Sequence, residues 1–402
     1  MAENKEKKVL NVPNLRFPEF EGEWEESTIE KQFELYSGNT PSRINKELFN
    51  GTINWISSGE LKEHYIYSTK ERISQEAANN LKLLSVGTFV IAIYGLEAEG
   101  VRGTGSITQE PSTISQACMA FTPKGEITNE FLYSWYKKHG NVIGVKYAQG
   151  TKQQNLSYDI LEKFKISYPN VKEQDKLNLF FSLIDKRIST QNKIIEDLKK
   201  LKCAIIEKHY RQAKLHKYKI CDLGVPFSVG SLSKEDLSEK GHECILYGEL
   251  FTTYDCVINE IKSHTNKIAN MTLSQKRDLL FPSSTTVDAV SLISPSVIDI
   301  PNVVLGGDMF GIHIDKKFNA YYLSYYINII TRKKLAIYAK GSTIIHLHYK
   351  DIAKAQLLLP DLCEQDRIAK CMMAEDDKIK VEEQLMTKLE EQKQYLLRQM
   401  FI

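Results

Sequence analysis

Two stretches of this sequence decide its fold: PNVKEQDKLNLFFSLIDKRI at residues 169–188 and PDLCEQDRIAKCMMAEDDKI at residues 360–379. Both begin with proline and carry the triplet Glu-Gln-Asp at the same distance from it. The two stretches lie 191 residues apart, and the same register continues without a gap over residues 147–210 and 338–401. Agreement over that length in one register indicates an internal duplication, which has to be recognised before the fold is assigned.

Other identities support the same register, and the likeness weakens toward the N-terminal side of each copy. Tyr147, Ala148, Gly150, Leu156, Tyr158 and Leu198 correspond to Tyr338, Ala339, Gly341, Leu347, Tyr349 and Leu389. Upstream, Phe131-Leu132 and Trp135 fall opposite Tyr322-Leu323 and Tyr326, and Gly59-Glu60-Leu61 resembles Gly248-Glu249-Leu250. The chain therefore alternates a variable unit with a shared segment, twice.

Each shared segment is predicted to be one long helix. Proline followed by carboxylates at Glu173 and Asp175, or at Glu364 and Asp366, suits a helix N-terminus, where the helix dipole is positive. No further proline or glycine interrupts either segment for about 40 residues. A helix of that length extends about 60 Å.

The apolar residues of both helices recur in steps of four and three, which is the spacing of a coiled-coil seam. Polar residues interrupt the seam at Gln191 and Lys202, and at Glu375, Glu382 and Lys393. The apolar positions are Leu177, Phe181, Ile184, Ile188, Ile195, Leu198 and Ile205 in the first helix, and Ile368, Met372, Ile379, Met386, Leu389, Leu396 and Met400 in the second.

The two helices carry opposite net charge. Residues 170–210 hold 9 Lys/Arg against 6 Asp/Glu, and residues 361–401 hold 7 against 10. Opposite charge favours pairing of the two helices with each other over self-pairing. The alternative is that each helix packs separately on its own domain. A helix of this length cannot bury its apolar stripe on one small domain, so we expect an antiparallel pair.

The sequence therefore predicts an α+β protein: two related globular α/β domains separated by two long helices that pair as an antiparallel coiled coil, with pseudo-twofold symmetry. The expected bounds are 1–165 for the first domain, 169–212 for the first helix, 213–359 for the second domain and 360–402 for the second helix. A length of 402 residues and a hydrophobic content of 42% suit several folded domains. Two-fold-related domains on a rigid spacer would meet two half-sites on one face of a DNA duplex.

Composition excludes several classes of protein. A net charge of +2 gives no general argument for nucleic-acid binding, so any basic surface must be local. Seven cysteines without a CxxC pair predict reduced thiols in a cytoplasmic protein rather than a disulfide framework or zinc site. The lysine-containing N-terminus has no apolar core of a secretion signal. The longest apolar run, Leu83 to Leu96, is too short to cross a bilayer, and we expect no membrane association.

Sequence motifs of catalysis are missing. We find no (D/N)PP(F/Y) of adenine methyltransferases, no GxGxxG after a strand, no GxxxxGK(S/T) phosphate loop and no GxSxG. Gly103-Thr104-Gly105 is a single GxG, more typical of a loop. His346-x-His348 could ligate a metal from one strand face, but without a third ligand polar histidines are favoured. We therefore expect a chain that is not an enzyme, with no cofactor or metal of its own; an enzyme whose motif escapes detection is the remote alternative.

The duplicated order of motifs resembles the specificity subunit of type I restriction–modification enzymes over nearly the whole chain. The similar motifs are Pro13-x-Leu15-Arg16-Phe17-Pro18-x-Phe20-x-Gly22-x-Trp24, Gly38-x-Thr40-Pro41-Ser42, Ile53-x-Trp55-Ile56-x-x-Gly59-Glu60-Leu61, the domain-ending loops at Gly150–Leu156 and Gly341–Leu347, and the helix starts at Pro169–Asp175 and Pro360–Asp366. The second domain departs from this pattern. Between Tyr218 and Leu250 it lacks the Gly-x-Thr-Pro-Ser run and has only Pro226-Phe227-Ser228-Val229-Gly230.

The resemblance implies that this chain recognises a bipartite, asymmetric target in double-stranded DNA. It also implies two copies of a methyltransferase (M) subunit as partners and, through them, the endonuclease/translocase (R) subunits. Adenine-N6 methylation would use S-adenosylmethionine, and cleavage would use ATP and Mg²⁺, all bound by those partner subunits. The alternative function is a standalone duplicated DNA-binding or coiled-coil scaffold protein.

Candidate DNA contacts are polar and basic residues at predicted turns, because base edges are read by Arg, Lys, Asn, Gln, Ser and Thr, and phosphates by Lys and Arg. Adjacent amides at Gln153-Gln154 can both donate to and accept from adenine. The alternatives are a structural turn there and solvated surface charge elsewhere. The first domain offers Thr40, Ser42, Arg43, Lys46, Ser57, Ser58, Arg102, Lys146, Lys152, Gln153 and Gln154; the second offers Tyr247, Lys267, Lys276, Arg277, Lys340, Ser342 and Thr343. Trp55 and the tyrosines at 133, 321, 322, 325 and 326 are more typical of core residues than of base stacking.

Overall fold

The computed structural model describes residues 10–402, and they divide into two compact units. The first unit runs up to Asn192 and also contains Gln384–Ile402; the second is Lys193–Glu383. This division cuts both long helices near their middle, so half of each helix belongs to each unit. Residues 1–9 of the first predicted domain lie outside the described residues. None of the described helices has the length and apolar character needed to span a membrane.

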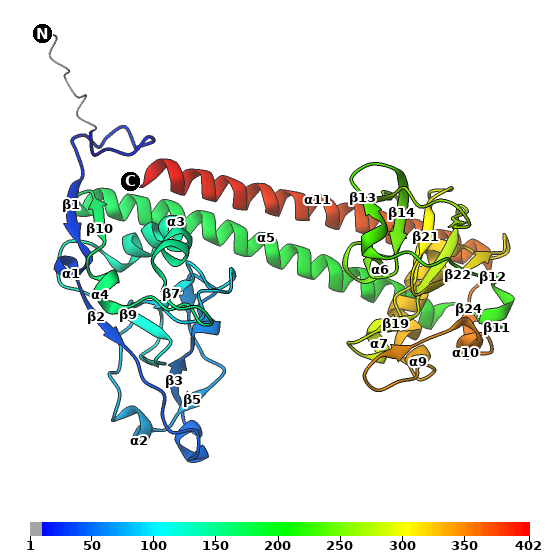
Figure 1. The fold of residues 1–402 in the computed structure, drawn as a ribbon, viewed down its shortest axis with the longest axis horizontal. Helices are drawn as coiled ribbons and strands as arrows, with labels where there is room; N and C mark the ends of the chain where they lie inside the picture. Colours follow the sequence, from blue (N-terminus) through cyan, green and yellow to red (C-terminus); the bar gives the residue numbers. More distant parts are fainter. Residues whose placement is uncertain (1–9) are drawn as a thin grey trace, which may run out of the picture. The chain divides into compact units, whose positions relative to one another are not determined.

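The two long helices are α5 (Val171–Gln212) and α11 (Leu362–Met400), shown in green and red in Figure 1. Each begins two residues after the proline of its shared segment, as the sequence predicts. They contain 42 and 39 residues, which confirms the predicted length. Within each unit the stretches of α5 and α11 lie side by side (Figure 1).

In the first unit, the N-terminal half of α5 packs on the C-terminal end of α11. Leu177 and Phe181 are buried in one hydrophobic cluster with Leu397, Met400 and Phe401. The ring centroids of Phe181 and Phe401 lie 5.5 Å apart. The same cluster includes residues of the adjoining sheet, so here the helices contact both each other and their own domain.

In the second unit, the C-terminal half of α5 packs on the N-terminal half of α11. Lys199 Nζ lies 2.7 Å from Glu383 Oε1, and His209 Nε2 lies 2.5 Å from Glu364 Oε2. Rising residue numbers on α5 therefore meet falling numbers on α11. The same holds in the first unit, so the predicted antiparallel pairing is confirmed within both.

Two polar seam residues are paired across the seam in equivalent ways. Lys393 of α11 forms an ion pair with Asp185 of α5, and Lys202 of α5 forms one with Asp376 of α11. These pairs are copies of one interaction, because Asp185 and Asp376, and likewise Lys202 and Lys393, are 191 residues apart. The four side chains are between 15% and 29% exposed. Removing one partner would leave the other charge partly buried without its counterion.

The first unit contains a five-stranded sheet of order β2-β9-β6-β7-β4, a three-stranded sheet of order β5-β3-β8 and the antiparallel pair β1-β10. Helix α3 packs against β6, β7 and β9. The elements are β1 (Glu25–Thr28), α1 (Ile29–Gln32), β2 (Phe33–Ser37), η1 (Lys46–Phe49), β3 (Ile53–Ile56), η2 (Ser58–Glu60), β4 (Tyr65–Ile66), β5 (Arg72–Ile73), α2 (Gln75–Ala78), β6 (Phe89–Ala92), β7 (Gly105–Thr108), β8 (Ser112–Ile114), β9 (Cys118–Pro123), α3 (Asn129–Tyr147), α4 (Tyr158–Leu161) and β10 (Lys165–Tyr168).

The second unit repeats this plan. Its sheets have the orders β12-β22-β18-β20-β15 and β13-β16-β14-β21-β17, with smaller pairs β11-β24 and β19-β23. The elements are β11 (His216–Lys219), η3 (Ile220–Asp222), β12 (Gly224–Ser228), η4 (Lys234–Asp236), β13 (Leu237–Ser238), β14 (His242–Leu246), α6 (Glu249–Thr252), β15 (Val257–Ile258), β16 (Ser263–Thr265), β17 (Thr272–Leu273), β18 (Asp278–Pro282), β19 (Ser284–Thr285), α7 (Ala289–Leu292), β20 (Ser296–Ile298), β21 (Val304–Gly306), β22 (Met309–Ile314), α8 (Ala320–Tyr326), the π-helical turn η5 (Ile327–Thr331), α9 (Arg332–Ala336), β23 (Ile345–His346), α10 (Tyr349–Ile352) and β24 (Gln356–Leu359).

Strand for strand, the sheet β12-β22-β18-β20-β15 corresponds to β2-β9-β6-β7-β4, and α8 begins 191 residues after α3. The predicted α+β class and the duplication of the domains are therefore confirmed. The duplication also extends into regions where the sequences have diverged. The aromatic residues Trp55, Tyr133, Tyr322, Tyr325 and Tyr326 are buried, as expected of core residues, whereas Tyr321 is only half-buried.

The shared glutamine of the Glu-Gln-Asp triplet explains why this motif is duplicated. Buried Gln174 donates from Nε2 to the carbonyl of Pro169 and accepts the backbone N–H of Thr128, the residue that caps α3. Gln365 donates in the same way to Pro360 and accepts the N–H of Asn319, the cap of α8. One side chain therefore ties the start of each long helix to the helix that covers its own sheet.

Replacing a seam residue should destabilise the protein far more than replacing a neighbour on the exposed face. Phe181 is 1% exposed and Leu179 is 60% exposed, on the same turn of α5. Phe181→Ala should lower the free energy of unfolding by about 3–5 kcal/mol because it leaves a cavity. Leu179→Ala should change it by less than about 0.5 kcal/mol. Urea denaturation followed by circular dichroism measures the free energy of unfolding of both variants. Equal losses would contradict the burial of Phe181 in the helix–helix seam.

Candidate nucleic-acid interface

Each unit presents a short loop of the same construction, directly after the helix that covers its sheet. In the first unit the backbones of Gln149 and Asn155 exchange hydrogen bonds of 2.8 and 2.9 Å across the base of the loop. In the second, Lys340 and His346 do the same at 2.9 and 2.7 Å. We call residues 149–155 and 340–346 the recognition loops.

Both recognition loops depend on a glycine in a left-handed conformation. Gly150 has φ of 119° and Gly341 has φ of 125°. A Cβ at Gly150 would lie 2.1 Å from the carbonyl oxygen of Gln153, and one at Gly341 would lie 2.0 Å from that of Ile344. Any other residue would strain the turn and collide with its backbone. The tight turn holds the intervening side chains outward.

Each loop is also fixed to its sheet by the buried leucine that follows it. The backbone N–H of Leu156 donates to Ile93, and that of Leu347 donates to Ser283, both at 2.9 Å. Leu156 is 2% exposed and Leu347 is fully buried. A rigid base with exposed polar tips is the arrangement expected of a surface that recognises another molecule.

In the first unit, the structure brings several predicted residues together at the recognition loop. Lys152 and Gln153 are exposed at its tip, and Gln154 is half-buried. The backbone of Gln154 accepts from Leu96 and donates to the Glu97 carboxylate, which keeps the pKa of Glu97 below its usual value. The side-chain amides of both glutamines make no hydrogen bond to another described residue, so they remain available.

Arg102 and Lys146 flank this loop. The guanidinium of Arg102 donates to the carbonyls of Leu96 and Glu97 at 2.6 and 3.1 Å, so it orders the neighbouring turn. Lys146 lies at the end of α3 with its ammonium 5.2 Å from the ring of Tyr147. Of these two cations, Lys146 is the more exposed.

A second group of predicted residues lies around β3 of the smaller sheet. Arg43 is not a free cation there: it forms a bidentate ion pair with Glu71 at 2.6 and 2.8 Å and lies 4.5 Å from the ring of Phe49. Ser57 bonds to the Glu60 carboxylate in a capping arrangement. The other members are Thr40, Ser42, Lys46 and Ser58, which are half-buried or exposed.

In the second unit, four predicted residues have structural partners. Lys267 pairs with Asp236 at 3.0 Å, and Lys276 lies 3.4 Å from Asp299. Arg277 has φ of 75° and donates to the carbonyl of Phe318. Tyr247 is half-buried beside Gly307. The fourth residue with a partner, Lys340, pairs with Asp351 at 2.6 Å and lies with Ser342 and Thr343 on the second recognition loop.

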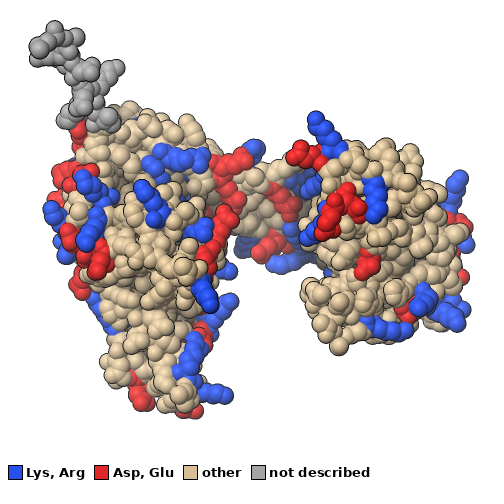
Figure 2. Space-filling model, in the orientation of Figure 1, with Lys and Arg blue, Asp and Glu red and all other residues tan. Residues whose placement is uncertain are grey.

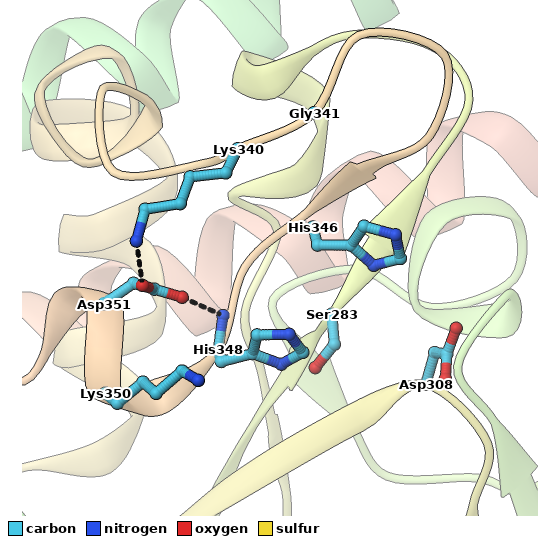
Figure 3. Close-up of a pocket in the computed structure, with 8 residues that line it drawn as sticks. All are labelled: Ser283, Asp308, Lys340, Gly341, His346, His348, Lys350 and Asp351. Atoms are coloured by element: carbon cyan, nitrogen blue, oxygen red, sulfur yellow. Dashed lines mark hydrogen bonds and ion pairs between the residues drawn. The ribbon is translucent and has the colours of Figure 1, made fainter.

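Beside this loop lies an open pocket of about 540 Å³; of its lining residues, the sequence singled out only Lys340 as a DNA contact (Figure 3). His346, the last residue of β23, and His348, the residue before α10, both point into it, with ring centroids 6.1 Å apart and rings inclined by 13°. The remaining lining residues are Ser283, Asp308, Lys340, Gly341, Lys350 and Asp351. The alternation His-x-His-x-Lys over residues 346–350 was the sequence signal for this cluster.

The charges around the pocket partly cancel. Lys340 Nζ lies 2.6 Å from Asp351 Oδ1, and this contact lowers the pKa of Asp351. Asp308 accepts from the Ser284 hydroxyl at 2.8 Å. Lys350 has no ion-pair partner among residues 10–402. Within that part of the chain no group of three His, Cys, Asp or Glu side chains could hold a metal ion.

The visible surface is not uniformly basic. On the face drawn in Figure 2, Lys and Arg side chains stand in small groups interspersed with Asp and Glu. This agrees with the net charge of +2. Any contact with a polyanion must therefore depend on local elements such as the recognition loops.

Comparison with known families gives one match. The sequence profile described as "Type I restriction modification DNA specificity domain" matches residues 21–200 and again residues 224–391. Each match spans one globular domain and most of the long helix that follows it. The duplication found in the sequence is therefore also the repeat unit of this family.

Individual relatives point the same way. The chain is 29% identical over 189 residues to the EcoR124I/EcoR124II specificity subunit of Escherichia coli, and 28% identical over 185 residues to the MjaIX specificity subunit of Methanocaldococcus jannaschii. These alignments cover 46% and 44% of this chain, and 45% and 42% of the relatives, so less than half of each relative is matched.

A solved structure extends the likeness to nearly the whole fold. The S subunit of a type I restriction–modification system from M. genitalium aligns with a TM-score of 0.59 at 16% identity. The alignment covers 97% of this chain and 99% of that one. At this identity the likeness concerns the fold alone.

The glycine of the first recognition loop should be far less replaceable than a glycine of the same unit that lies in open space. Gly150→Ala should lower the free energy of unfolding by about 1–3 kcal/mol, because alanine resists the left-handed conformation and its Cβ meets the Gln153 carbonyl. Gly59→Ala is the control, since a Cβ there has no neighbour within 4 Å. Thermal unfolding and limited proteolysis at residues 149–155 check both; equal tolerance would show that the loop is not held as described.

Proposed function

The chain belongs to the type I restriction modification DNA specificity family, and we propose that it selects a bipartite, asymmetric DNA target on behalf of partner subunits. The family match covers both repeats, and each repeat carries a recognition loop on a rigid base. The observation that carries the proposal is that two domains share one scaffold while their loop tips differ in chemistry.

The loop tips supply different sets of hydrogen-bonding groups. The first loop presents the amides of Gln153 and Gln154, and a paired donor and acceptor suits the edge of adenine in the major groove. The second presents Ser342 and Thr343 beside the pocket of His346, His348 and Lys350, which is richer in donors. Two half-sites read by different chemistry give a target without twofold symmetry, although the scaffold is duplicated.

The long helices are proposed to set the separation of the half-sites. Each passes from one unit to the other without proline or glycine, and 42 residues of helix extend about 63 Å. The ion pairs Asp185–Lys393 and Asp376–Lys202 fix the register of the pair within each unit. A fixed separation would require a constant number of unspecified base pairs between the two half-sites.

Catalysis is assigned to partners. We propose two methyltransferase subunits, which the duplicated helices could bind in equivalent ways, and endonuclease/translocase subunits joined through them. S-adenosylmethionine, ATP and Mg²⁺ would be bound by those subunits, which would methylate adenine N6 or cleave DNA. In this arrangement the chain itself is not an enzyme, and the complex acts on DNA in the cytoplasm.

Exchanging one domain should change one half of the methylated sequence. The chain is expressed with its methyltransferase partner, and N6-methyladenine is mapped in the host DNA. A chimera in which residues 25–165 come from another specificity subunit should retain one half-site and the spacer, and replace the other half-site. Absent or unchanged methylation would instead favour a standalone DNA-binding or scaffold protein.

Substitutions in the recognition loops should affect one half-site each. Gln153→Ala or Gln154→Ala should weaken binding of the cognate duplex by about 1–3 kcal/mol and relax base preference in the first half-site only. Thr343→Ala is the corresponding change in the second recognition loop and should relax only the second half-site. Affinities are measured by titration against duplexes altered one half-site at a time. Equal loss on every sequence would mean a phosphate contact.

A further inference from the structure

One buried histidine of the first unit is held between two carboxylates and two aromatic rings. His64 Nε2 lies 2.9 Å from Glu130 Oε2, and His64 Nδ1 lies 3.3 Å from Asp185 Oδ2. The rings of Tyr65 and Tyr133 stack on its two faces, each with centroids 4.0 Å apart. The side chain of His64 is only 10% exposed.

This geometry favours the doubly protonated imidazole. A neutral ring has one N–H, so one nitrogen would turn a lone pair toward a carboxylate. The imidazolium can pair with both, through a hydrogen bond to Glu130 and an ion pair without hydrogen-bond geometry to Asp185. Its charge is also favourable between the faces of two tyrosine rings. Burial by itself lowers the pKa of His64, but the contacts with Asp185 and Glu130 outweigh it, so the pKa lies above the ordinary value of 6.5.

His64 connects three parts of the first unit. It lies in the segment before β4, Glu130 belongs to the first turn of α3, and Asp185 lies on the seam of α5. Asp185 in turn forms the ion pair with Lys393 of α11. The histidine therefore attaches the globular domain to the carboxylate that already joins the two long helices.

The second unit attaches its domain to the equivalent carboxylate with a different group. Asp376 pairs with Lys202 and accepts the hydroxyl of Tyr325 at 2.5 Å. Burial and then the charge of Asp376 raise the pKa of Tyr325, so the phenol stays neutral throughout the physiological range. The same seam position is thus bound by a titratable cation in one unit and by a neutral donor in the other.

We propose that His64 is a positioning residue for DNA recognition: as an imidazolium it fixes the first domain on the helix pair, and raising the pH withdraws this anchor from the first unit alone. The expected effect on DNA recognition rests on the proposed function. The attachment of the first domain by His64 does not. No contact between His64 and DNA is required.

The direction of the pH effect follows from the raised pKa of His64. The contribution of this contact to the stability of the fold is complete below pH 6.5. It is lost as the pH rises through the pKa of His64 in the folded protein, which lies above 6.5. The other charged or titratable groups around the histidine are Glu130, Asp185, Tyr65, Tyr133, Lys393, Lys137 and Glu63. Among these, burial and then Lys393 lower the pKa of Lys137 to about 8, so the pH dependence has to be assigned by substitution of His64 itself.

The anchor is tested first without DNA. Hydrogen exchange of the full chain is measured between pH 6 and 9, corrected for the intrinsic rate. In the wild type, residues 61–66 and 129–136 should lose protection by about tenfold as the pH rises. In His64→Gln, which folds with a neutral amide in place of the imidazole, these segments should be less protected at pH 6 and show no further pH-dependent loss. Residues 320–326 of the second unit should show no pH dependence in either protein.

The positioning role is then tested on the complex with its methyltransferase partner. Discrimination between the cognate duplex and duplexes with one scrambled half-site is measured over the same pH range. For the first half-site it should fall about tenfold in the wild type from pH 6 to 9, and should be low and constant in His64→Gln. Tyr325→Phe is the matched control: it should lower discrimination of the second half-site only, equally at every pH.

Lys393→Gln separates the histidine from the ion pair on which it acts, because it removes the lysine from Asp185 and leaves His64 in place. The pH dependence of first-half-site discrimination should persist in this variant. Protection that does not change with pH in the wild type would overturn the anchor. Protection that changes while half-site discrimination does not would overturn the positioning role. If protection depends on pH as expected but neither the wild type nor any variant binds DNA sequence-specifically, the proposed function is overturned. The attachment of the first domain by His64 would still be supported.

Discussion

The structure depends on the burial of one long apolar stripe on each of two helices. A helix of about 40 residues exposes more apolar surface than a domain of this size can cover, so α5 and α11 bury their stripes against each other. In this antiparallel register the seam residues Lys202 and Lys393 each lie beside a counterion of the other helix. Buried ion pairs contribute less to stability than apolar packing, but they penalise other alignments.

Duplication gives the two units one framework and leaves their tips free to differ. Three shared residues of each unit hold the framework together. They are the glycine of each recognition loop, the leucine that fixes it to the sheet, and the glutamine that joins the long helix to the covering helix. The side chains at the loop tips differ, with glutamines in the first loop and serine and threonine in the second.

The candidate site was predictable only where function depends on neighbours in sequence. The recognition loops could be found because glycine, polar tip and leucine lie within a few residues of one another. Arg43 illustrates the limit, since its pairing with Glu71 joins residues 28 apart and was invisible in the sequence. His64 is more extreme: Glu130 and Asp185 lie 66 and 121 residues away along the chain. The DNA contacts themselves stay predictions.

The sequence by itself determined the duplication, the two long helices, their seam and the α+β class, because these follow from local periodicity and from a register that repeats every 191 residues. Tertiary structure alone decided which polar side chains are engaged in the fold and which remain available. It also decided how each domain is attached to its helices, through an imidazole in one unit and a phenol in the other. Such attachments join residues distant in sequence, and no periodic pattern encodes which side chains meet there.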